Sequence, residues 1–214
     1  ADLTVRLPGG EVMLAGQTLA VAPGEQILLQ GPSGSGKSTL FRSLAGIWPF
    51  AQGRVRLPAS SMFIPQRPYF PNGPLRDALA YPEPASRYTD EALHQALHEA
   101  LLPDLVNRLD EADAWSQKLS GGEQQRLAIA RVLLKQPQWV CADEASSALD
   151  PLAEATLYQR LIELVKRTGG GLVSIAHRPS LAGFPGHRRT LVPEPAGPPA
   201  RSRVQVAASG DKPA

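Results

Sequence analysis

A strand, a glycine-rich turn and a helix follow one another near the start of the chain. Residues 26–30 read QILLQ and are apolar without alternation, as in a strand that is covered on both faces. The glycine-rich sequence GPSGSGKS follows at residues 31–38, and we predict a helix from about Ser38 to Leu44. This order restricts the possible folds more than any other feature because it is the context that a phosphate-binding loop requires.

The turn matches the G-x-x-x-x-G-K-[ST] pattern of phosphate-binding loops. Its glycines permit a backbone whose N–H groups point at phosphate oxygens, and the helix N-terminus adds a partial positive charge. Lys37 is predicted to reach the β- and γ-phosphates, and the Ser38 hydroxyl to bind Mg²⁺. The alternative is an ordinary turn between a strand and a helix. The residues predicted to bind nucleotide here are Gly31, Ser33, Gly34, Ser35, Gly36, Lys37, Ser38 and Thr39.

Composition indicates one globular protein domain, or one domain with a small additional lobe. The chain has 214 residues, of which 43% are hydrophobic and 20% charged. A net charge of +2 is too small for a dedicated nucleic-acid surface. The single cysteine, Cys141, stands in an apolar run, which predicts a buried thiol and a reducing compartment. No apolar run of about 18 residues and no signal-peptide pattern is visible, so we expect the chain to be soluble by itself.

Further buried strands alternate with helices along the chain. Residues 138–142 and 172–176 are apolar runs like residues 26–30, and helices are predicted between them. Buried strands separated by helices indicate an α/β fold with a parallel sheet. The first thirty residues alternate apolar and polar positions between Pro-Gly pairs, which predicts short antiparallel strands, Leu19–Val21 among them.

Residues 58–85 are rich in proline and are predicted to be irregular. Thr89 and Asp90 then open an amphipathic helix, and we expect a helical lobe at about 70–135. Asp150 and Pro151 supply the N-cap and the first turn of a later helix. The predicted domain covers residues 1–192, and residues 193–214, rich in Pro, Ala, Gly and Ser, are expected to be a disordered tail.

Two adjacent carboxylates follow the second buried strand. Asp143 and Glu144 come at its carboxyl end, which in a parallel sheet lies at the same edge as the phosphate loop. Asp143 is predicted to hold Mg²⁺ through water, and Glu144 to orient or deprotonate an attacking water. Taken alone, such a pair is also typical of a solvated loop whose carboxylates cap a helix.

A pair of glycines opens the helix of the sequence KLSGGEQQRLAIARVLL. Ser120 and Glu123 form the pattern of a capping box, which explains these two residues structurally. It does not explain Gly121 and Gly122, since glycine costs about 1 kcal/mol relative to alanine inside a helix. Two residues without Cβ at a helix N-terminus can let a phosphate touch the backbone. Because the phosphate loop already holds a nucleotide, we predict that this second anion site serves a partner copy in a two-fold arrangement.

The stretch Leu119–Arg126 resembles the signature motif of the ATP-binding cassette (ABC) ATPases. The phosphate loop, Gln66, Asp143-Glu144, the D-loop-like Ser147–Asp150 and His177 occur in that family's order. The resemblance covers about residues 3–192. Two further stretches, at 63–69 and 73–82, are similar to a narrower subgroup that contains the peroxisomal fatty-acyl half-transporters and bacterial relatives, some of which handle peptides or vitamin B12.

The resemblance implies the ABC fold of P-loop NTPases: a mainly parallel core sheet, an antiparallel β subdomain and a helical subdomain. It implies that Lys37, Gln66, Glu144 and His177 act in Mg²⁺-dependent ATP hydrolysis, with Gln66 in the shell of the Mg²⁺ and His177 at the γ-phosphate. Ser38, Gln66 and Asp143 are then the metal-site residues. The nucleotide-binding residues beyond the phosphate loop are Ser120, Gly121, Gly122, Glu123 and Asp150.

The partners implied by the resemblance are a second copy and a membrane domain. The two copies form a head-to-tail homodimer in the presence of ATP. The membrane-spanning domain normally precedes the ATPase on the same native chain, and residues 65–82 receive it. The implied location is the cytoplasmic face of the inner (plasma) membrane, with no nucleic acid as partner.

One departure from the family concerns the nucleotide base. Many members stack adenine on an aromatic residue in the first strand pair, whereas no Phe, Tyr or Trp precedes Phe41 here. We therefore expect only a modest preference between ATP and GTP.

Three other functions are compatible with a phosphate loop. A soluble ABC ATPase of DNA repair or translation usually has two cassettes or a long coiled-coil insertion. A small-molecule kinase needs an acceptor pocket and a lid in place of the Ser120–Glu123 sequence. A sensor without turnover would not need all of the expected catalytic residue types.

Overall fold

The computed structural model describes residues 2–175, 187–193 and 202–206. The strands are β1 (Leu3–Arg6), β2 (Val12–Gln17), β3 (Gln26–Gln30), β4 (Ala51–Gln52), β5 (Ser61–Ile64), β6 (Gly73–Pro74), β7 (Ala112–Asp113), β8 (Trp139–Asp143), β9 (Gly171–Ile175), β10 (His187–Pro193) and β11 (Ser202–Val206). The α-helices are α1 (Lys37–Leu44), α2 (Leu75–Ala80), α3 (Asp90–Glu99), α4 (Trp115–Lys118), α5 (Gly121–Lys135) and α6 (Pro151–Arg167). Two 3-10 helices, η1 (Ala85–Arg87) and η2 (Pro103–Arg108), complete these elements.

Most strands of the described residues belong to one sheet with the order β4-β1-β2-β11-β10-β3-β9-β8-β5. Its core, from β10 to β5, is parallel throughout. At the other end β1 pairs antiparallel with β2 and with β4. The predicted parallel core with antiparallel strands is therefore confirmed, and the antiparallel strands continue the core sheet.

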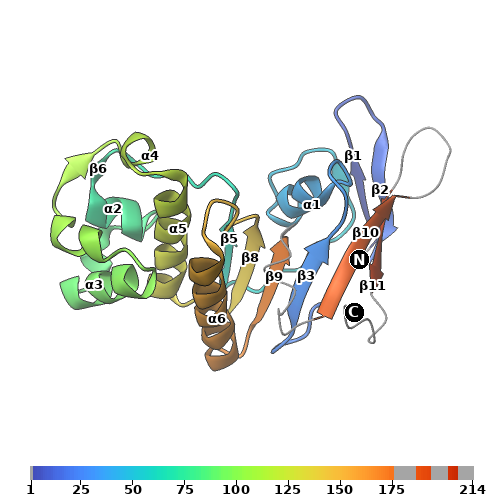
Figure 1. The fold of residues 1–214 in the computed structure, drawn as a ribbon. Helices are drawn as coiled ribbons and strands as arrows, with labels where there is room; N and C mark the ends of the chain where they lie inside the picture. The colour runs from blue at the N-terminus through green and yellow to red at the C-terminus, as the bar shows by residue number, and fades with distance from the viewer. Residues whose placement is uncertain (1, 176–186, 194–201, 207–214) are drawn as a thin grey trace.

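The two faces of the sheet are buried by different elements, as Figure 1 shows. Val140 and Ala142 of β8 pack in the larger apolar cluster, together with residues of α5 and α6. Cys141 points to the opposite face and packs in a second cluster with Leu40 and Phe41 of α1. Alternate residues of a strand point to opposite faces, so one short apolar run supplies both clusters. The prediction that Cys141 is buried is confirmed.

Helices α2 to α5 lie together beyond the β5 edge of the sheet (Figure 1). The short strands β6 and β7 pair with each other in this region. Buried leucines of α3 and α5 join it to the larger cluster of the sheet. The predicted boundaries of the helical lobe and of the domain stay predictions.

Three helices begin where local sequence signals predict. The Thr89 side chain accepts a hydrogen bond from the Ala92 N–H, as an N-cap does. Ser120 and Glu123 form both bonds of the capping box at the start of α5. The Asp150 carboxylate caps α6, in which Pro151 is the first residue. Each of these signals acts within four residues, so the rest of the fold is not needed to form it.

Two local predictions are wrong. Residues 58–85 contain β5 and α2, because the prolines lie outside these elements and Pro74 and Tyr81 bound α2. Residues 19–21 form no strand.

In the tail, predicted to be disordered, Ser202–Val206 form β11, which pairs antiparallel with β10 and also contacts β2. A neighbouring strand can hold a segment of low apolar content through backbone hydrogen bonds, and composition does not reveal this. Residues 194–201 and 207–214 of the predicted tail lie outside the described residues.

Within the described part of the chain, no helix combines the length and the apolar character needed to cross a lipid bilayer.

Candidate functional site

Three parallel strands bring the predicted catalytic residues to one edge of the sheet. The phosphate loop (Gly31–Ser38) follows β3, Asp143 ends β8, and Gln66 comes two residues after β5. Because β3, β8 and β5 are parallel within one sheet, their carboxyl ends lie at the same edge. Residues more than a hundred positions apart in sequence therefore come together here.

The phosphate loop has the backbone that its glycines permit. Gly34 and Gly36 have φ values of +78° and +92°, a region that side chains with a Cβ rarely adopt. Lys37 is buried, and its Nζ donates to the carbonyl oxygens of Gly31 and Pro32 at 2.8 Å each. Burial lowers the pKa of Lys37, while the charges of Glu144 and Asp143 oppose this effect. The ammonium group thus lies inside the loop and bonds only to dipoles that a phosphate can replace.

Two oxygen-bearing side chains of the predicted metal site touch each other. The Ser38 hydroxyl donates to Asp143 Oδ1 at 3.3 Å, across 105 positions of sequence. Asp143 is 5% exposed, and burial raises its pKa, opposed by the bond from Ser38. A buried carboxylate beside a hydroxyl is a donor set that suits a hard divalent cation.

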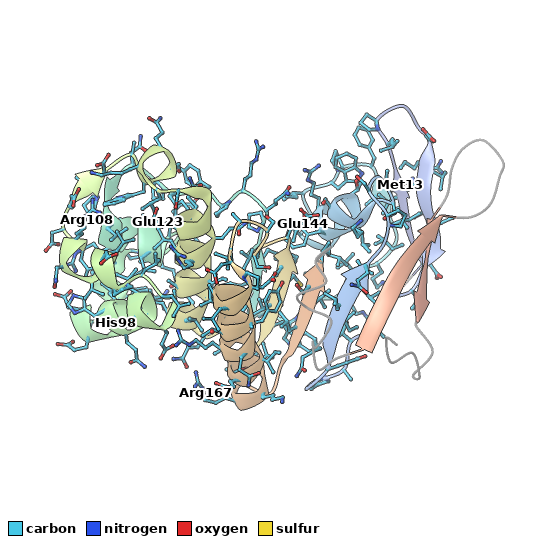
Figure 2. All side chains as sticks on the ribbon, in the orientation of Figure 1. Met13, His98, Arg108, Glu123, Glu144 and Arg167 are labelled. Carbon is cyan, nitrogen blue, oxygen red and sulfur yellow. The ribbon has the colours of Figure 1, made fainter. Side chains whose placement is uncertain are left out.

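Glu144 lies next to this pair in a strained conformation. Its φ is +48°, which is uncommon for a residue other than glycine, and strained conformations of this kind tend to cluster at functional sites. The Gln66 amide donates to Glu144 Oε2 at 2.7 Å. Figure 2 shows Glu144 between α5 and α1, in the middle of the molecule. The structure thus joins Gln66 to Glu144 and places Lys37, Ser38 and Asp143 at the same edge.

The glycine-fronted end of α5 is separate from this group. Ser120 and Glu123 bond to each other, with Ser120 Oγ 2.6 Å from Glu123 Oε2. Figure 2 shows Glu123 in the helical part of the molecule. A Cβ on Gly122 would lie 3.2 Å from the Ala148 carbonyl oxygen, and one on Gly121 would lie 3.6 Å from the Ala148 Cβ. Close packing against Ala148 is thus a structural reason for glycine at 122.

Two predicted site residues remain, Asp150 and His177, and the structure describes only the first of them. Asp150 Oδ1 accepts from the N–H groups of Leu152 and Ala153 at 3.0 and 2.9 Å. These bonds, first of all the one from Ala153, lower the pKa of Asp150, so its Oδ1 serves as the cap of α6 within the same chain. His177 lies outside the described residues.

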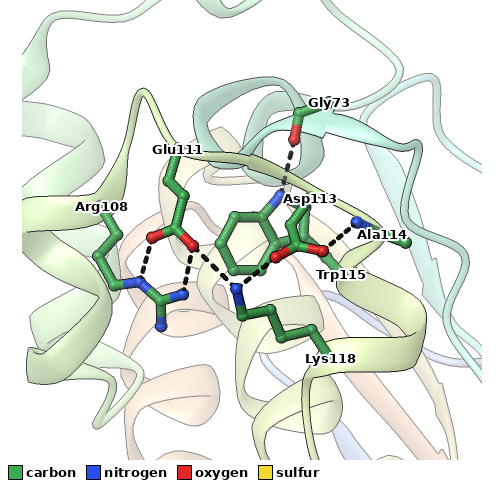
Figure 3. A network of polar contacts seen from close by, with 7 residues as sticks. All are labelled: Gly73, Arg108, Glu111, Asp113, Ala114, Trp115 and Lys118. Carbon is green, nitrogen blue, oxygen red and sulfur yellow. Dashed lines mark hydrogen bonds and ion pairs between the residues drawn. The ribbon is translucent and has the colours of Figure 1, made fainter.

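A network of charged residues holds the segment that leads into α5 (Figure 3). The Arg108 guanidinium donates two bonds to the Glu111 carboxylate at 2.6 and 2.8 Å. Lys118 pairs with both Glu111 and Asp113, and the two cations lie 5.3 and 5.8 Å from the ring centroid of Trp115. Arg108, followed by Lys118, lowers the pKa of Glu111 to about 2. Every charge in this network has an opposite charge beside it.

Two further residues lie at these sites and were not predicted from sequence. Met13 of β2 packs on the phosphate loop, because a Cβ on Gly36 would lie 2.5 Å from its sulfur. Gln125 of α5 is buried and bonds to Ser147 and Ala148. Met13 has no local signal in the sequence. Gln125 stands within the Leu119–Arg126 stretch, but its contacts with residues 144–148 join distant segments and could not be predicted from that stretch.

Comparisons with known proteins agree with this geometry. The family model described as ABC transporter matches residues 14–147. An ABC transporter ATP-binding protein of Synechocystis is 46% identical over 84% of this chain and 27% of its own length. The mouse ATP-binding cassette sub-family D member 3 is 34% identical over 81% of this chain and 27% of its own length. A solved structure, a bacterial Atm1-family ABC exporter with ATP bound, has a TM-score of 0.76 and 27% identity over 89% of this chain and 36% of its own.

These matches confirm the resemblance, including the narrower subgroup, because several relatives are named members of sub-family D. The relatives are named as transporters, which supports a transporter ATPase over a soluble ABC ATPase. The chain spans about a quarter to a third of the length of the curated relatives it matches best. The chain belongs to the ABC transporter family, and it is the ATP-binding domain that hydrolyses ATP in that family.

Proposed function

We propose that this domain binds ATP with Mg²⁺ and hydrolyses it within a head-to-tail pair of copies, and that the hydrolysis powers transport by an attached membrane domain. The single observation that carries this proposal is the group formed by Lys37, Ser38, Asp143, Glu144 and Gln66 at the carboxyl edge of the sheet. It contains a cation for the phosphates, oxygens for a metal and a carboxylate for water.

The residues present fit a magnesium ion. Ser38 and Asp143 offer hard oxygen donors 3.3 Å apart, and the Gln66 side chain adds an amide oxygen nearby. Mg²⁺ prefers one or two protein ligands together with phosphate oxygens, so such a small donor set is sufficient. When bound, the ion supplies positive charge at the oxygens of the transferred phosphoryl group.

Each of the chain's own residues then has a separate role in ATP hydrolysis. Lys37 leaves the carbonyl oxygens of Gly31 and Pro32 and donates to the phosphates. Glu144 accepts a hydrogen bond from the attacking water and orients it in line with the terminal phosphoryl group. The Gln66 amide holds the Glu144 carboxylate, so movement of the Gln66 loop changes the position of the base.

A second copy completes the site. The N-terminus of α5, with Gly121 and Gly122, offers backbone N–H groups that can approach the terminal phosphate of the partner's nucleotide. The Ser120 hydroxyl is exposed at the same helix end. A two-fold pair would bury two nucleotides, each between the phosphate loop of one copy and the α5 end of the other.

The membrane partner is proposed from the names of relatives and from one surface. The relative in Escherichia coli is named an inner membrane ABC transporter ATP-binding protein, and the similar structure is an exporter. Tyr69 and Tyr81 are 62% and 39% exposed and touch each other within the proline-rich residues 65–82. We propose that this surface receives a membrane domain that precedes residue 1 on the native chain, at the cytoplasmic face of the inner membrane.

Replacement of Glu144 tests the proposed function. Glu144→Gln keeps the size of the side chain and removes its ability to take a proton, so we expect ATP hydrolysis to fall by about a hundredfold or more. An ATP-bound dimer should then accumulate on a sizing column. Glu163→Gln, an exposed residue of α6, is the matched control and should behave as wild type. Normal turnover in the Glu144 variant would remove this residue from the mechanism.

A further inference from the structure

One buried amide connects α5 to the segment that follows β8. The side chain of Gln125 is on the first turns of α5, and the residue is 5% exposed. Its Nε2 donates to Ser147 Oγ at 2.9 Å and to the Glu144 carbonyl oxygen at 3.3 Å, and its Oε1 accepts from the Ala148 N–H at 2.8 Å. The amide therefore binds both ends of the segment 144–148.

This segment needs to be held in place. Glu144 has the left-handed φ of +48°, and such a conformation persists only where the surroundings impose it. Its N–H donates to the Ile175 carbonyl oxygen of β9 at 2.9 Å, and its own carbonyl oxygen accepts from Ser147 N–H and from Gln125. Gln125 is thus the contact that fixes Glu144 from the side of α5.

The same segment packs on the glycines of α5. Gly122 lies against the Ala148 carbonyl group, with only 3.2 Å between that oxygen and a Cβ placed on the glycine. The Ala148 N–H, on the other side of the same residue, is bonded to Gln125. The start of α5 and the segment 144–148 are therefore joined both by close packing and by a buried hydrogen-bonded amide.

We infer that Gln125 is a positioning residue that makes the base of one nucleotide site and the glycine-fronted helix end of the other site move as one body. This inference rests on the proposed function, in which Glu144 serves the nucleotide of its own copy and the α5 end serves that of the partner. Any displacement of α5 on contact with the partner's nucleotide is then passed to the segment 144–148 by the packing of Gly122 on Ala148, and to the Glu144 backbone itself by the Gln125 side chain. The two sites of a pair are coupled by this link within each chain.

Two variants of the full chain separate the bonds that Gln125 makes. Gln125→Met has a similar length and removes all three bonds. Gln125→Glu keeps an acceptor for the Ala148 N–H but sets a buried carboxylate oxygen against the Glu144 carbonyl oxygen, so exchange at 144–150 should rise at least as much as in Gln125→Met. Gln159→Met, at an exposed glutamine of α6 whose amide donates to Glu163, is the matched control.

Hydrogen exchange and kinetics report on the link independently. Without nucleotide, amide exchange in a peptide covering 144–150 should be about fivefold faster in Gln125→Met, because a hydrogen bond is lost. The Kd for ATP should stay within about twofold, since the phosphate loop is unchanged, while kcat falls about tenfold or more through misplacement of Glu144.

Two outcomes would overturn the inference: unchanged exchange at 144–150, or a rise in Kd that accounts for the whole loss of activity. If the wild-type chain itself shows no turnover, the proposed function fails, and the exchange measurement alone still decides whether Gln125 holds the segment. An unfolded Gln125→Met variant is recognised by fast exchange throughout α5, and Gln125→Glu then supplies the same comparison.

Discussion

Charged side chains are arranged differently at the carboxyl edge of the sheet and in the helical part of the molecule. At the edge, Asp143 and Glu144 are adjacent like charges, and the buried ammonium of Lys37 bonds to backbone carbonyl oxygens. In the helical part, Arg108, Glu111, Lys118 and Asp113 pair with one another in a closed network. The helical network pairs each charge directly with an opposite one, whereas the edge sets two adjacent carboxylates close to one buried ammonium group.

This difference supports the proposal that the carboxyl edge of the sheet binds the nucleotide. Burial shifts the pKa values of Lys37 and Asp143 against the effect of the opposite charges near them, and such shifts are concentrated at functional sites. In the helical part, Arg108, Glu111, Asp113 and Lys118 instead bond to one another beside Trp115, in the segment before α5 (Figure 3). Three substitutions test this comparison, from the largest expected effect to the smallest.

Lys37→Met should have the largest effect on activity. The variant removes the charge that stabilises the transferred phosphoryl group, so we expect ATP hydrolysis to fall about a thousandfold and ATP binding to weaken. Steady-state ATPase assays and equilibrium binding measure the two effects. Lys166→Met, at an exposed position of α6, removes the same charge elsewhere and should leave both unchanged. Retained activity in the Lys37 variant would mean that the edge of the sheet is not the catalytic region.

Trp115→Ala should have the largest effect on stability. Trp115 is fully buried, and its Nε1 donates to the Gly73 carbonyl oxygen at 2.8 Å. Loss of the side chain should lower the free energy of unfolding by about 3–5 kcal/mol, measured by urea denaturation. Tyr69→Ala, at a position that is 62% exposed, should change it by no more than about 0.5 kcal/mol. Equal losses of unfolding free energy in the Trp115→Ala and Tyr69→Ala variants would show that the buried Trp115 ring does not hold the helical part together.

Glu111→Gln should have a small effect that depends on pH. The pKa of Glu111 is lowered to about 2 in the folded chain, first by Arg108 and then by Lys118, and is about 4.3 when unfolded. A lowered pKa adds stability that is present above about pH 4.3 and is lost as the pH falls toward 2. The melting temperatures of the Glu111→Gln variant and of the wild type should therefore converge as the pH falls through this range, as thermal melts would show.

The control for this experiment is Glu163→Gln on α6. The difference in melting temperature between this variant and the wild type should not depend on pH in the way expected for Glu111→Gln. High salt should also reduce the Glu111 effect near neutral pH, because the pair is partly exposed to solvent. A difference that stays constant down to about pH 2 would exclude the ion pairs of Figure 3 as its cause.

The sequence by itself determined the features that depend on a few neighbouring residues. The helix caps at Thr89, Ser120 and Asp150 are formed by hydrogen bonds within three residues, so the residue types alone specify them. The phosphate loop is specified in the same way, because its glycines and its position between strand and helix define the backbone. The alternation of strands and helices was enough to predict a parallel sheet, and with it the edge where Asp143 and Glu144 lie.

Only the tertiary structure decided the contacts between distant segments. The bonds from Gln66 to Glu144 and from Ser38 to Asp143 join residues 78 and 105 positions apart, and the Gln125 amide reaches across to Ala148. The strand at Ser202–Val206 likewise exists because β10 and β2 offer it backbone partners. Such contacts depend on how whole elements pack, and side-chain packing and backbone pairing leave no periodic or local pattern in the residues that take part.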